Sequence, residues 1–338
     1  MRLLGLEFAP LRLPLHRRLE TMATVYFSFS FLCVGALGII INVYLLLCTQ
    51  LCVVPIIYFV WYISDISICN RGGRRSAWTR NWTIWKYFRD YFPIDLVKTR
   101  DLDPSKNYIF GYHPHGIMCV GAFCNFATEA TGFSEMFPGI TPHLLALQGQ
   151  FWFPLHRELL LSTGMCSSTK ESLEWIFTKK GEGNAAVLVI GGAVEALDAH
   201  PGSCRLTFNT RKGFIKLALK HGVSLVPVFS FGENDLFIQA KNEEGSVLRR
   251  VQTKLTKVLG FATPLFHGRG IFQYNYGYLP FRQRVVTVVG QPIDVERKES
   301  PTQEDIEQLH AEYANALTHL FYEYKEAYAP TSAPLLIS

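Results

Sequence analysis

The residues best suited to chemistry form the motif His113-Pro114-His115-Gly116. It follows Tyr108 to Tyr112, an apolar run typical of a buried strand, and small residues from Ile117 onward predict a helix. In α/β proteins, ligands bind where a strand ends near the start of a helix. The positive end of a helix dipole disfavours protonated imidazole, so a histidine placed there stays neutral and can act as a base at pH 7.

Two other interpretations of the histidine pair are open. One imidazole can simply brace the turn, and we expect this of one of the two. A metal site needs a third His, Cys or carboxylate at ligand spacing, and none stands nearby, so no metal is expected. The sequence also lacks a Gly-x-Ser-x-Gly elbow, a His-Glu-x-x-His pair and a phosphate-binding loop with a Gly-Lys-Ser/Thr end.

A further set of polar residues comes just after a predicted strand or at the start of a predicted helix: Glu195, Arg211, Lys212, Glu233 and Asn234. Each one alone is typical of a cap or a turn. Because the ends of successive strands meet at one edge of a sheet, these side chains can converge with the histidines on one cleft.

Short apolar runs alternate with amphipathic stretches after Arg100. The apolar runs predict four buried strands, at residues 108–112, 185–190, 224–230 and 285–289. The amphipathic stretches predict three helices: 168–180 with Ser168 and Glu171 as a capping box, 210–221 ended by Gly222, and one opened by Ser300 and Pro301. Strands separated by helices indicate an α/β domain with a largely parallel sheet.

An uncharged block of 44 residues runs from Thr21 to Ser64. One helix of that length would span about 66 Å, roughly twice the hydrocarbon core of a bilayer, so two helices that break near residues 49–55 fit better. Arginines flank both ends of the block, at positions 12, 17, 18, 71, 74, 75 and 80. Basic residues favour the cytosolic side, so the block predicts a membrane hairpin with both termini in the cytosol.

The predicted organisation is a cytosolic tail at 1–20, a hairpin at 21–64, a cytosol-facing domain at 65–330 and a C-terminal tail at 331–338. A charged fraction of 18% and a net charge of +5 exclude a disordered chain and a nucleic-acid arm. The eight cysteines form no CxxC pair, which favours a reduced, cytosol-facing chain. Residues 144–165 are rich in Leu, Phe and Trp, which fits either a core helix or a stretch in the membrane interface with Trp152 and Phe153 toward lipid; we favour the interface.

In this order the motifs resemble the type 2 diacylglycerol acyltransferases and their relatives, the monoacylglycerol and wax-alcohol acyltransferases. The resemblance runs from about Leu6 to Tyr328. It rests on these motifs: Tyr91-Phe92-Pro93, His113-Pro114-His115-Gly116, Gly191-Gly192-Ala193 with Glu195, Arg211-Lys212-Gly213-Phe214, Leu225-Val226-Pro227-Val228 and Phe231-Gly232-Glu233-Asn234. The short N-terminus with Glu7-Phe8-Ala9-Pro10 looks most like the monoacylglycerol acyltransferases.

The resemblance implies transfer of a fatty acyl group from acyl-CoA to an acylglycerol, without a cofactor, in the endoplasmic reticulum membrane; contact with lipid droplets and a homo-oligomer are left open. Residues 211–228 also resemble the glycerol-phosphate acyltransferases, in which an Asp follows the catalytic His by five positions. Here Met118 and Val120 stand at those places. The group that orients the base is therefore open.

The hypothesis is that neutral His115 takes the proton of the acceptor hydroxyl, with His113 and Glu195 as its catalytic partners. Main-chain N–H groups at the helix start near Gly116 are expected to hold the oxyanion. The expected substrate-binding residues are Gly116, Tyr91, Phe92, Pro93, Arg211, Lys212, Gly213, Glu233 and Asn234, with Arg211 and Lys212 toward the CoA phosphates.

Three alternatives stay open from the sequence alone. The acceptor can be diacylglycerol or a long-chain alcohol in place of monoacylglycerol. The pocket that selects the acceptor is expected to be apolar, and no sequence motif predicts which of these it binds. The chain can be a lipid hydrolase that uses water in place of the acylglycerol. It can also be a non-catalytic hairpin protein that shapes membrane, although this leaves the polar residues at the strand ends without a role.

Overall fold

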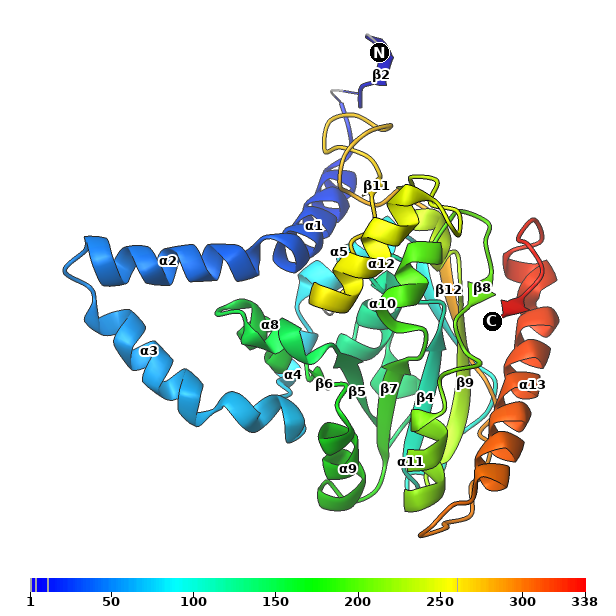
Figure 1. Ribbon diagram of the computed structural model, residues 1–338. Coiled ribbons are helices and arrows are strands. Elements are labelled where there is room, and N and C mark those ends of the chain that lie inside the picture. Colours follow the sequence, from blue (N-terminus) through cyan, green and yellow to red (C-terminus); the bar gives the residue numbers. More distant parts are fainter. Residues whose placement is uncertain (1, 4, 11, 260) are drawn as a thin grey trace.

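The computed structural model describes residues 2–3, 5–10, 12–259 and 261–338, and a seven-stranded sheet runs through its body (Figure 1). The strand order is β3 (Ile94–Lys98), β12 (Val285–Val289), β9 (Ser224–Phe231), β4 (Tyr108–His113), β7 (Asn184–Val189), β5 (Thr141–Ala146) and β6 (Cys166–Ser167). Neighbouring strands are parallel except β9 and β12. The prediction of an α/β domain with a largely parallel sheet is confirmed.

All four predicted strands are present, as β4, β7, β9 and β12. They are continuous apolar runs because both faces of the sheet are covered, and every residue of β4, β9 and β12 is buried. The sequence did not predict β3, β5 or β6. Charged residues interrupt β3, Pro142 and His143 interrupt β5, and β6 is only two residues long.

Helices cover the two faces of the sheet. One face carries α9 (Lys170–Lys179), α11 (Gly213–His221) and α13 (Gln303–Tyr328). The other carries α1 (Leu15–Leu32), α5 (Thr83–Tyr91) and the π-helical turn η2 (Phe123–Ala127). Gly111 in β4 permits close packing of α13, since a Cβ there would lie 2.0 Å from the Tyr313 hydroxyl.

The helix ends are partly as predicted. Gly222 ends α11 in the left-handed conformation with φ 65°. The cap of α9 is Thr169 rather than Ser168, because the Thr169 side chain accepts from the Ser172 N–H. Thr302 caps α13 in a capping box with Asp305, so that helix begins just after the predicted Ser300 and Pro301.

Short elements complete the fold. Besides α2 and α3, described below, the other helices are α4 (Ala77–Arg80), α6 (Val120–Ala122), α7 (Phe133–Met136), α8 (His156–Ser162), α10 (Gly192–Glu195), α12 (Val247–Leu259), η1 (Ile66–Asn70), η3 (Gln148–Trp152), η4 (Ala196–Asp198) and η5 (Glu233–Leu236). Three two-stranded pairs are β1 (Arg2–Leu3) with β2 (Leu6–Glu7), β10 (Ile238–Gln239) with β11 (Phe266–His267), and β8 (Arg205–Leu206) with β13 (Leu336–Ile337). Of the last pair, β13 lies in the predicted C-terminal tail and pairs in parallel with β8 of the domain.

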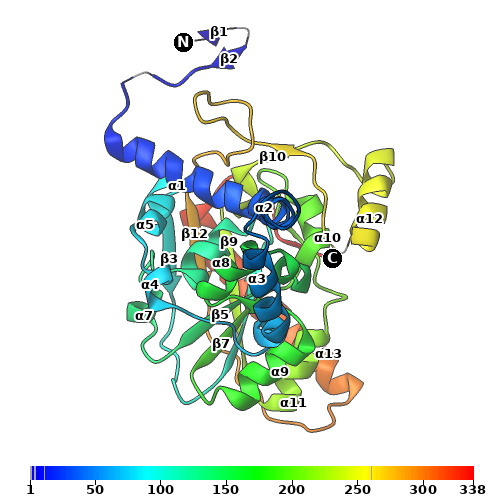
Figure 2. The same cartoon turned by 90° about the vertical axis from the view of Figure 1, so that its left-hand side faces the viewer.

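The predicted two-helix hairpin consists of three helices: α1, α2 (Val34–Cys48) and α3 (Val53–Ser64). Helix α1 begins inside the predicted tail and packs on α5 with Ala23 and Phe27 buried. It is bent by 64° from α2 at Cys33, and the chain reverses at residues 49–52, near the predicted break. Helices α2 and α3 project from the body as a V (Figure 1), and in Figure 2 they lie in front of the body, toward the viewer.

The surface of this V is apolar. Most large apolar side chains of α2 and α3 are exposed, and few of their residues are buried. Residues Val53–Asn70 are long and apolar enough to cross a membrane, and α1 with α2 passes the same criterion as a bent pair. These helices are consistent with membrane association.

A buried arginine, Arg80, connects α4 to the residues that follow the histidine motif. Arg80 at the end of α4 is 1% exposed and donates to the carbonyls of Phe126, Thr128 and Thr163 at 2.8 to 3.1 Å. It also pairs with Glu129, with Nε to Oε1 at 2.9 Å. This one side chain ties α4 to the end of η2, the turn that follows the histidine motif.

We predict that Arg80→Met lowers the free energy of unfolding by about 3 kcal/mol, because the variant leaves buried acceptors unpaired. Arg75 still pairs with Glu129 in the variant, so the expected loss of stability does not exceed about 3 kcal/mol. The measurement is thermal unfolding in detergent. Arg284→Met is the control, since its pair with Asp95 is exposed and should change stability by less than about 1 kcal/mol. Equal unfolding midpoints for the two variants would contradict the assignment.

Candidate active site

The histidine motif lies at the end of β4, where β7 and β9 also end. The loop after β7 carries Glu195 and the loop after β9 carries Glu233, so the sheet brings both carboxylates to the motif. The Glu195 side chain bonds to the main chain of His115, and the Glu233 side chain bonds to the main chain of Val120 and Gly121 just after the motif. The geometry of the two histidines differs.

His113 points into the core between the sheet and α13. Its Nε2 lies 3.2 Å from the Tyr313 hydroxyl, which itself donates to the Gly111 carbonyl at 3.0 Å. The hydroxyl therefore accepts from Nε2–H, and Nδ1 is left buried without a partner among the described residues. Complete burial lowers the pKa of His113 to about 3, so the ring is neutral. These are the contacts that a bracing histidine would make.

His115 is held in the state that a base requires. Its ring Nδ1 lies 2.9 Å from the Gly116 carbonyl, and a carbonyl only accepts, so Nδ1 carries the proton. Nε2 then has its lone pair free, and no described residue hydrogen-bonds to it. Burial lowers the pKa of His115, although its bond to the Gly116 carbonyl opposes the shift. The ring is therefore neutral at pH 7.

Glu195 holds the main chain of His115 rather than its ring. One carboxylate oxygen accepts from the His115 N–H at 2.7 Å and the other from the Thr207 N–H at 2.8 Å. Gly191 leaves room for this carboxylate, since a Cβ there would lie 2.1 Å from Oε2. Burial raises the pKa of Glu195 to about 7, while the two N–H donors oppose the shift.

Glu233 braces the same turn from behind. Its oxygens accept from the N–H groups of Val120 at 2.6 Å and Gly121 at 2.8 Å and from the Tyr112 hydroxyl at 3.0 Å. Burial raises the pKa of Glu233 to about 7. Its Cγ would lie 2.7 Å from a Cβ on Gly116, whose φ is 61°, so this position requires glycine.

These contacts correct two details of the expected site. The helix begins at Val120, not at Ile117, because Cys119 adopts a left-handed φ of 51° just before it. Glu233 occupies the N–H groups at that helix start, so they are not free to hold an oxyanion. The sequence expected Glu233 to bind substrate, whereas here both of its oxygens are bonded within the protein.

The other predicted residues are spread around the site. Arg211 donates to the Gly191 carbonyl at 3.2 Å, beside the Glu195 loop, and its Nε is buried without an acceptor among described residues. Lys212 is paired with Glu307 on α13, and Gly213 is exposed at the start of α11. Asn234 donates to the Ser203 carbonyl at 2.8 Å. The structure thus brings Arg211 to the site and places Lys212 on the outer surface.

The Tyr91-Phe92-Pro93 motif precedes β3 at the same end of the sheet, and two strands, β12 and β9, lie between β3 and β4. Tyr91 donates to the Pro280 carbonyl at 2.7 Å, and both Tyr91 and Phe92 are fully buried. Pro93 is exposed. The contacts of Tyr91 and Phe92 are those of core residues.

Sequence reasoning missed three residues that shape the motif: Tyr112, Thr207 and Tyr313. Tyr313 lies in the predicted helix opened by Ser300 and Pro301, and its hydroxyl was the available signal. Cys119 donates to the His115 carbonyl at 3.1 Å, and burial raises its pKa well above its usual range, so it is a thiol at pH 7. Among described residues, no group of three or more His, Cys, Asp or Glu is arranged to hold a metal ion.

The comparison with protein families decides the identity. Residues 44–338 match the model of the diacylglycerol acyltransferase family. The chain belongs to this family. It is therefore an acyltransferase of glycerolipid and triacylglycerol synthesis.

Individual members of the diacylglycerol acyltransferase family are similar along nearly the whole chain. Human 2-acylglycerol O-acyltransferase 1 is 52% identical over 95% of this chain and 96% of its own. Diacylglycerol O-acyltransferase 2 of Xenopus tropicalis is 50% identical over 91% of this chain and 86% of its own. Among solved structures, the lysophosphatidic acid acyltransferase PlsC of Thermotoga maritima aligns with a TM-score of 0.42 and 10% identity, over 91% of this chain and 97% of that one.

We predict that Tyr313→Phe destabilises the domain by about 1–3 kcal/mol, because the Gly111 carbonyl and His113 Nε2–H both lose a buried partner. Thermal unfolding in detergent measures the change. Tyr322→Phe on the same helix is the matched control, since its side chain is half-exposed and the substitution should leave the midpoint unchanged. A Tyr313→Phe midpoint equal to that of wild type would argue against the bracing role of His113.

Proposed function

We propose that the chain is an acyl-CoA:2-acylglycerol O-acyltransferase that converts monoacylglycerol to diacylglycerol in the endoplasmic reticulum membrane, with both termini cytosolic. The observation that supports catalysis is the neutral His115, whose Nδ1–H is fixed on the Gly116 carbonyl while Nε2 is free. Monoacylglycerol as acceptor rests on the match in length and identity to the human 2-acylglycerol enzyme.

The reaction proceeds by direct transfer in this proposal. The acceptor hydroxyl attacks the thioester carbonyl while His115 Nε2 takes its proton, so an ester C–O bond forms. The tetrahedral intermediate collapses, the C–S bond breaks, and the imidazolium returns the proton to the CoA sulfur. No protein nucleophile is needed, which agrees with the protonated thiol of Cys119.

The neighbouring groups position these reactants. Glu195 fixes the His115 main chain, and in its ionised form both of its oxygens accept from N–H groups. Glu233 fixes the turn that follows. Arg211 has unused donors beside the Glu195 loop and is proposed to bind a CoA phosphate. These are positioning and binding roles, and the base is His115.

Acceptor specificity is tested with labelled oleoyl-CoA and microsomes that express the chain. Separate reactions contain 2-monoacylglycerol, diacylglycerol and hexadecanol. The proposal expects labelled diacylglycerol from monoacylglycerol as the main product. Product from diacylglycerol or hexadecanol alone would keep the acyltransferase and change the acceptor, whereas CoA-independent release of free fatty acid would indicate a hydrolase.

We predict that His115→Ala lowers kcat by about 10² to 10⁴-fold, which is the usual contribution of a general base. The variant should sediment with membranes and unfold at the same temperature as wild type. His319→Ala on the exposed surface of α13 is the control and should keep full turnover. Wild-type kcat in His115→Ala would refute the assignment of the base.

We predict that Glu195→Gln lowers kcat roughly 10-fold with an unchanged KM, because the amide nitrogen faces an N–H donor and one buried hydrogen bond is lost. In wild type, kcat should rise with pH through about 7 as Glu195 ionises. The change in kcat that comes from protonation of His115 lies at lower pH, because burial lowers the pKa of His115.

The rise in kcat near pH 7 should vanish in Glu195→Gln. It should persist in Glu312→Gln, which changes an exposed carboxylate on α13. A Glu195→Gln profile that keeps this rise in kcat would contradict its assignment to Glu195 and would point to Glu233, whose pKa is also raised to about 7.

A further inference from the structure

We propose that residues 147–155, between β5 and α8, form a second membrane-contacting segment that lies in the lipid interface within the V of α2 and α3. The inference depends on membrane association of these two helices. It does not depend on the acyltransferase reaction. The occupant of this surface is phospholipid at the boundary between headgroups and acyl chains.

The segment presents apolar side chains where the sequence predicted an interfacial stretch. Leu147 is 43% exposed, Trp152 63%, Phe153 39% and Leu155 41%. Figure 1 shows α8, which follows the segment, in the opening of the V. The exposed apolar side chains of the segment therefore adjoin those of α2 and α3.

Two backbone groups of the segment bond to tyrosines of α3. The Trp152 carbonyl accepts from the Tyr62 hydroxyl at 3.1 Å, and the Leu155 N–H donates to the Tyr58 hydroxyl at 3.4 Å. His156 lies 3.1 Å from the Ser30 carbonyl through Nδ1 and 2.9 Å from Gln150 through Nε2. Bonds of this kind are what irregular backbone requires at membrane depth, where water is scarce.

Helix α2 packs tightly on the segment at two glycines. A Cβ on Gly35 would lie 3.0 Å from the Phe153 side chain, and one on Gly38 would lie 2.2 Å from the Pro154 carbonyl. These contacts hold the segment and its neighbour His156 against α1, α2 and α3. If α2 and α3 lie in lipid, the segment lies beside them there.

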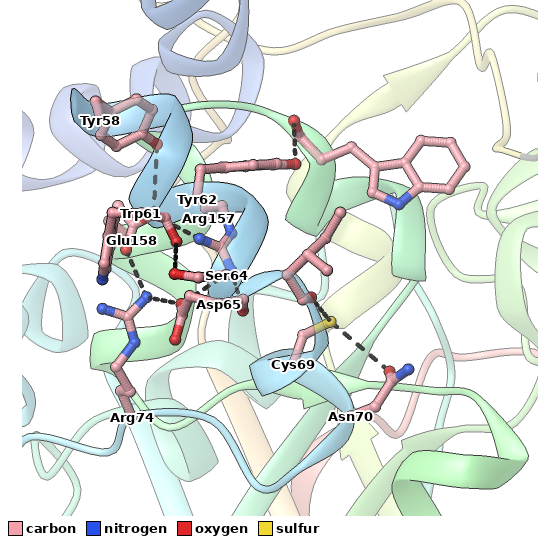
Figure 3. A network of polar contacts seen from close by, with 12 residues as sticks. Tyr58, Trp61, Tyr62, Ser64, Asp65, Cys69, Asn70, Arg74, Arg157 and Glu158 are labelled. Atoms are coloured by element: carbon pink, nitrogen blue, oxygen red, sulfur yellow. Dashed lines mark hydrogen bonds and ion pairs between the residues drawn. The ribbon is translucent and has the colours of Figure 1, made fainter. Parts of the chain in front are cut away.

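A cluster of four charged side chains lies where the segment meets the domain (Figure 3). Arg74 lies 2.7 Å from Asp65 and 2.9 Å from Glu158, and the fully buried Arg157 lies 3.2 Å from Asp65 and 3.1 Å from Glu158. Every charge has an opposite partner, so none faces the apolar V unpaired.

Aromatic side chains surround this charge cluster. The Arg157 guanidinium lies 4.6 Å from the Tyr62 ring centre, and Arg74 lies 4.7 Å from that of Trp61. Tyrosine and tryptophan concentrate at membrane–water interfaces. The cluster is therefore where the interface ends and the domain begins.

The test uses the full chain in bilayer nanodiscs made either with ordinary phosphatidylcholine or with phosphatidylcholine brominated on its acyl chains. Bromine quenches tryptophan only at short range. The Trp152 contribution is the difference between the emission of wild type and of Trp152→Phe. Trp175→Phe is the matched control, because Trp175 is half-buried on α9. Thermal unfolding verifies that both variants fold.

The proposal expects brominated lipid to reduce the Trp152 contribution by at least half and to leave the Trp175 contribution unchanged. Equal Trp152 contributions in the two lipids would overturn it. Equal quenching of both tryptophans would overturn it too, since the quenching would then not be specific to the segment. The readout is independent of acyl transfer, so a failure here is distinct from a failure of the proposed function.

Discussion

The site depends on a hydrogen bond between a buried carboxylate and a main-chain N–H. Glu195 accepts from the His115 N–H at 2.7 Å and is 2% exposed. Burial of a carboxylate is costly unless donors compensate, and Glu195 and Glu233 together take four N–H groups and one hydroxyl. The turn that carries His115 is held from both sides by these two side chains.

This arrangement separates two histidines that the sequence places side by side. Alternation along β4 turns His113 toward α13, where burial keeps it neutral and bonded to Tyr313. His115 lies past the strand end, with Nδ1 on a neighbouring carbonyl and Nε2 free. The carbonyl of Gly116 thus fixes the tautomer, a task that the Asp performs in the related His-and-Asp pattern.

The strands that were predicted are those with uninterrupted apolar runs, because a parallel sheet covered on both faces buries every residue. The helix start was misplaced by three residues, since its position depends on Glu233, which lies 113 residues away from Val120. Local sequence carries no signal for such a contact. The extra N-terminal helix has a similar cause: α1 is uncharged over most of its length but is packed on α5, and composition does not distinguish packing on protein from contact with lipid.

The central claim is that His115, not His113, is the base, and chemical mapping tests it most directly. Diethylpyrocarbonate modifies neutral imidazole nitrogens that reagents can reach, and mass spectrometry of membrane-bound protein assigns each modified residue. We predict that His115 is modified in parallel with loss of acyl transfer, that acyl-CoA protects it, and that His113 stays unmodified. Loss of activity that follows modification of His113 while His115 remains intact would contradict the assignment.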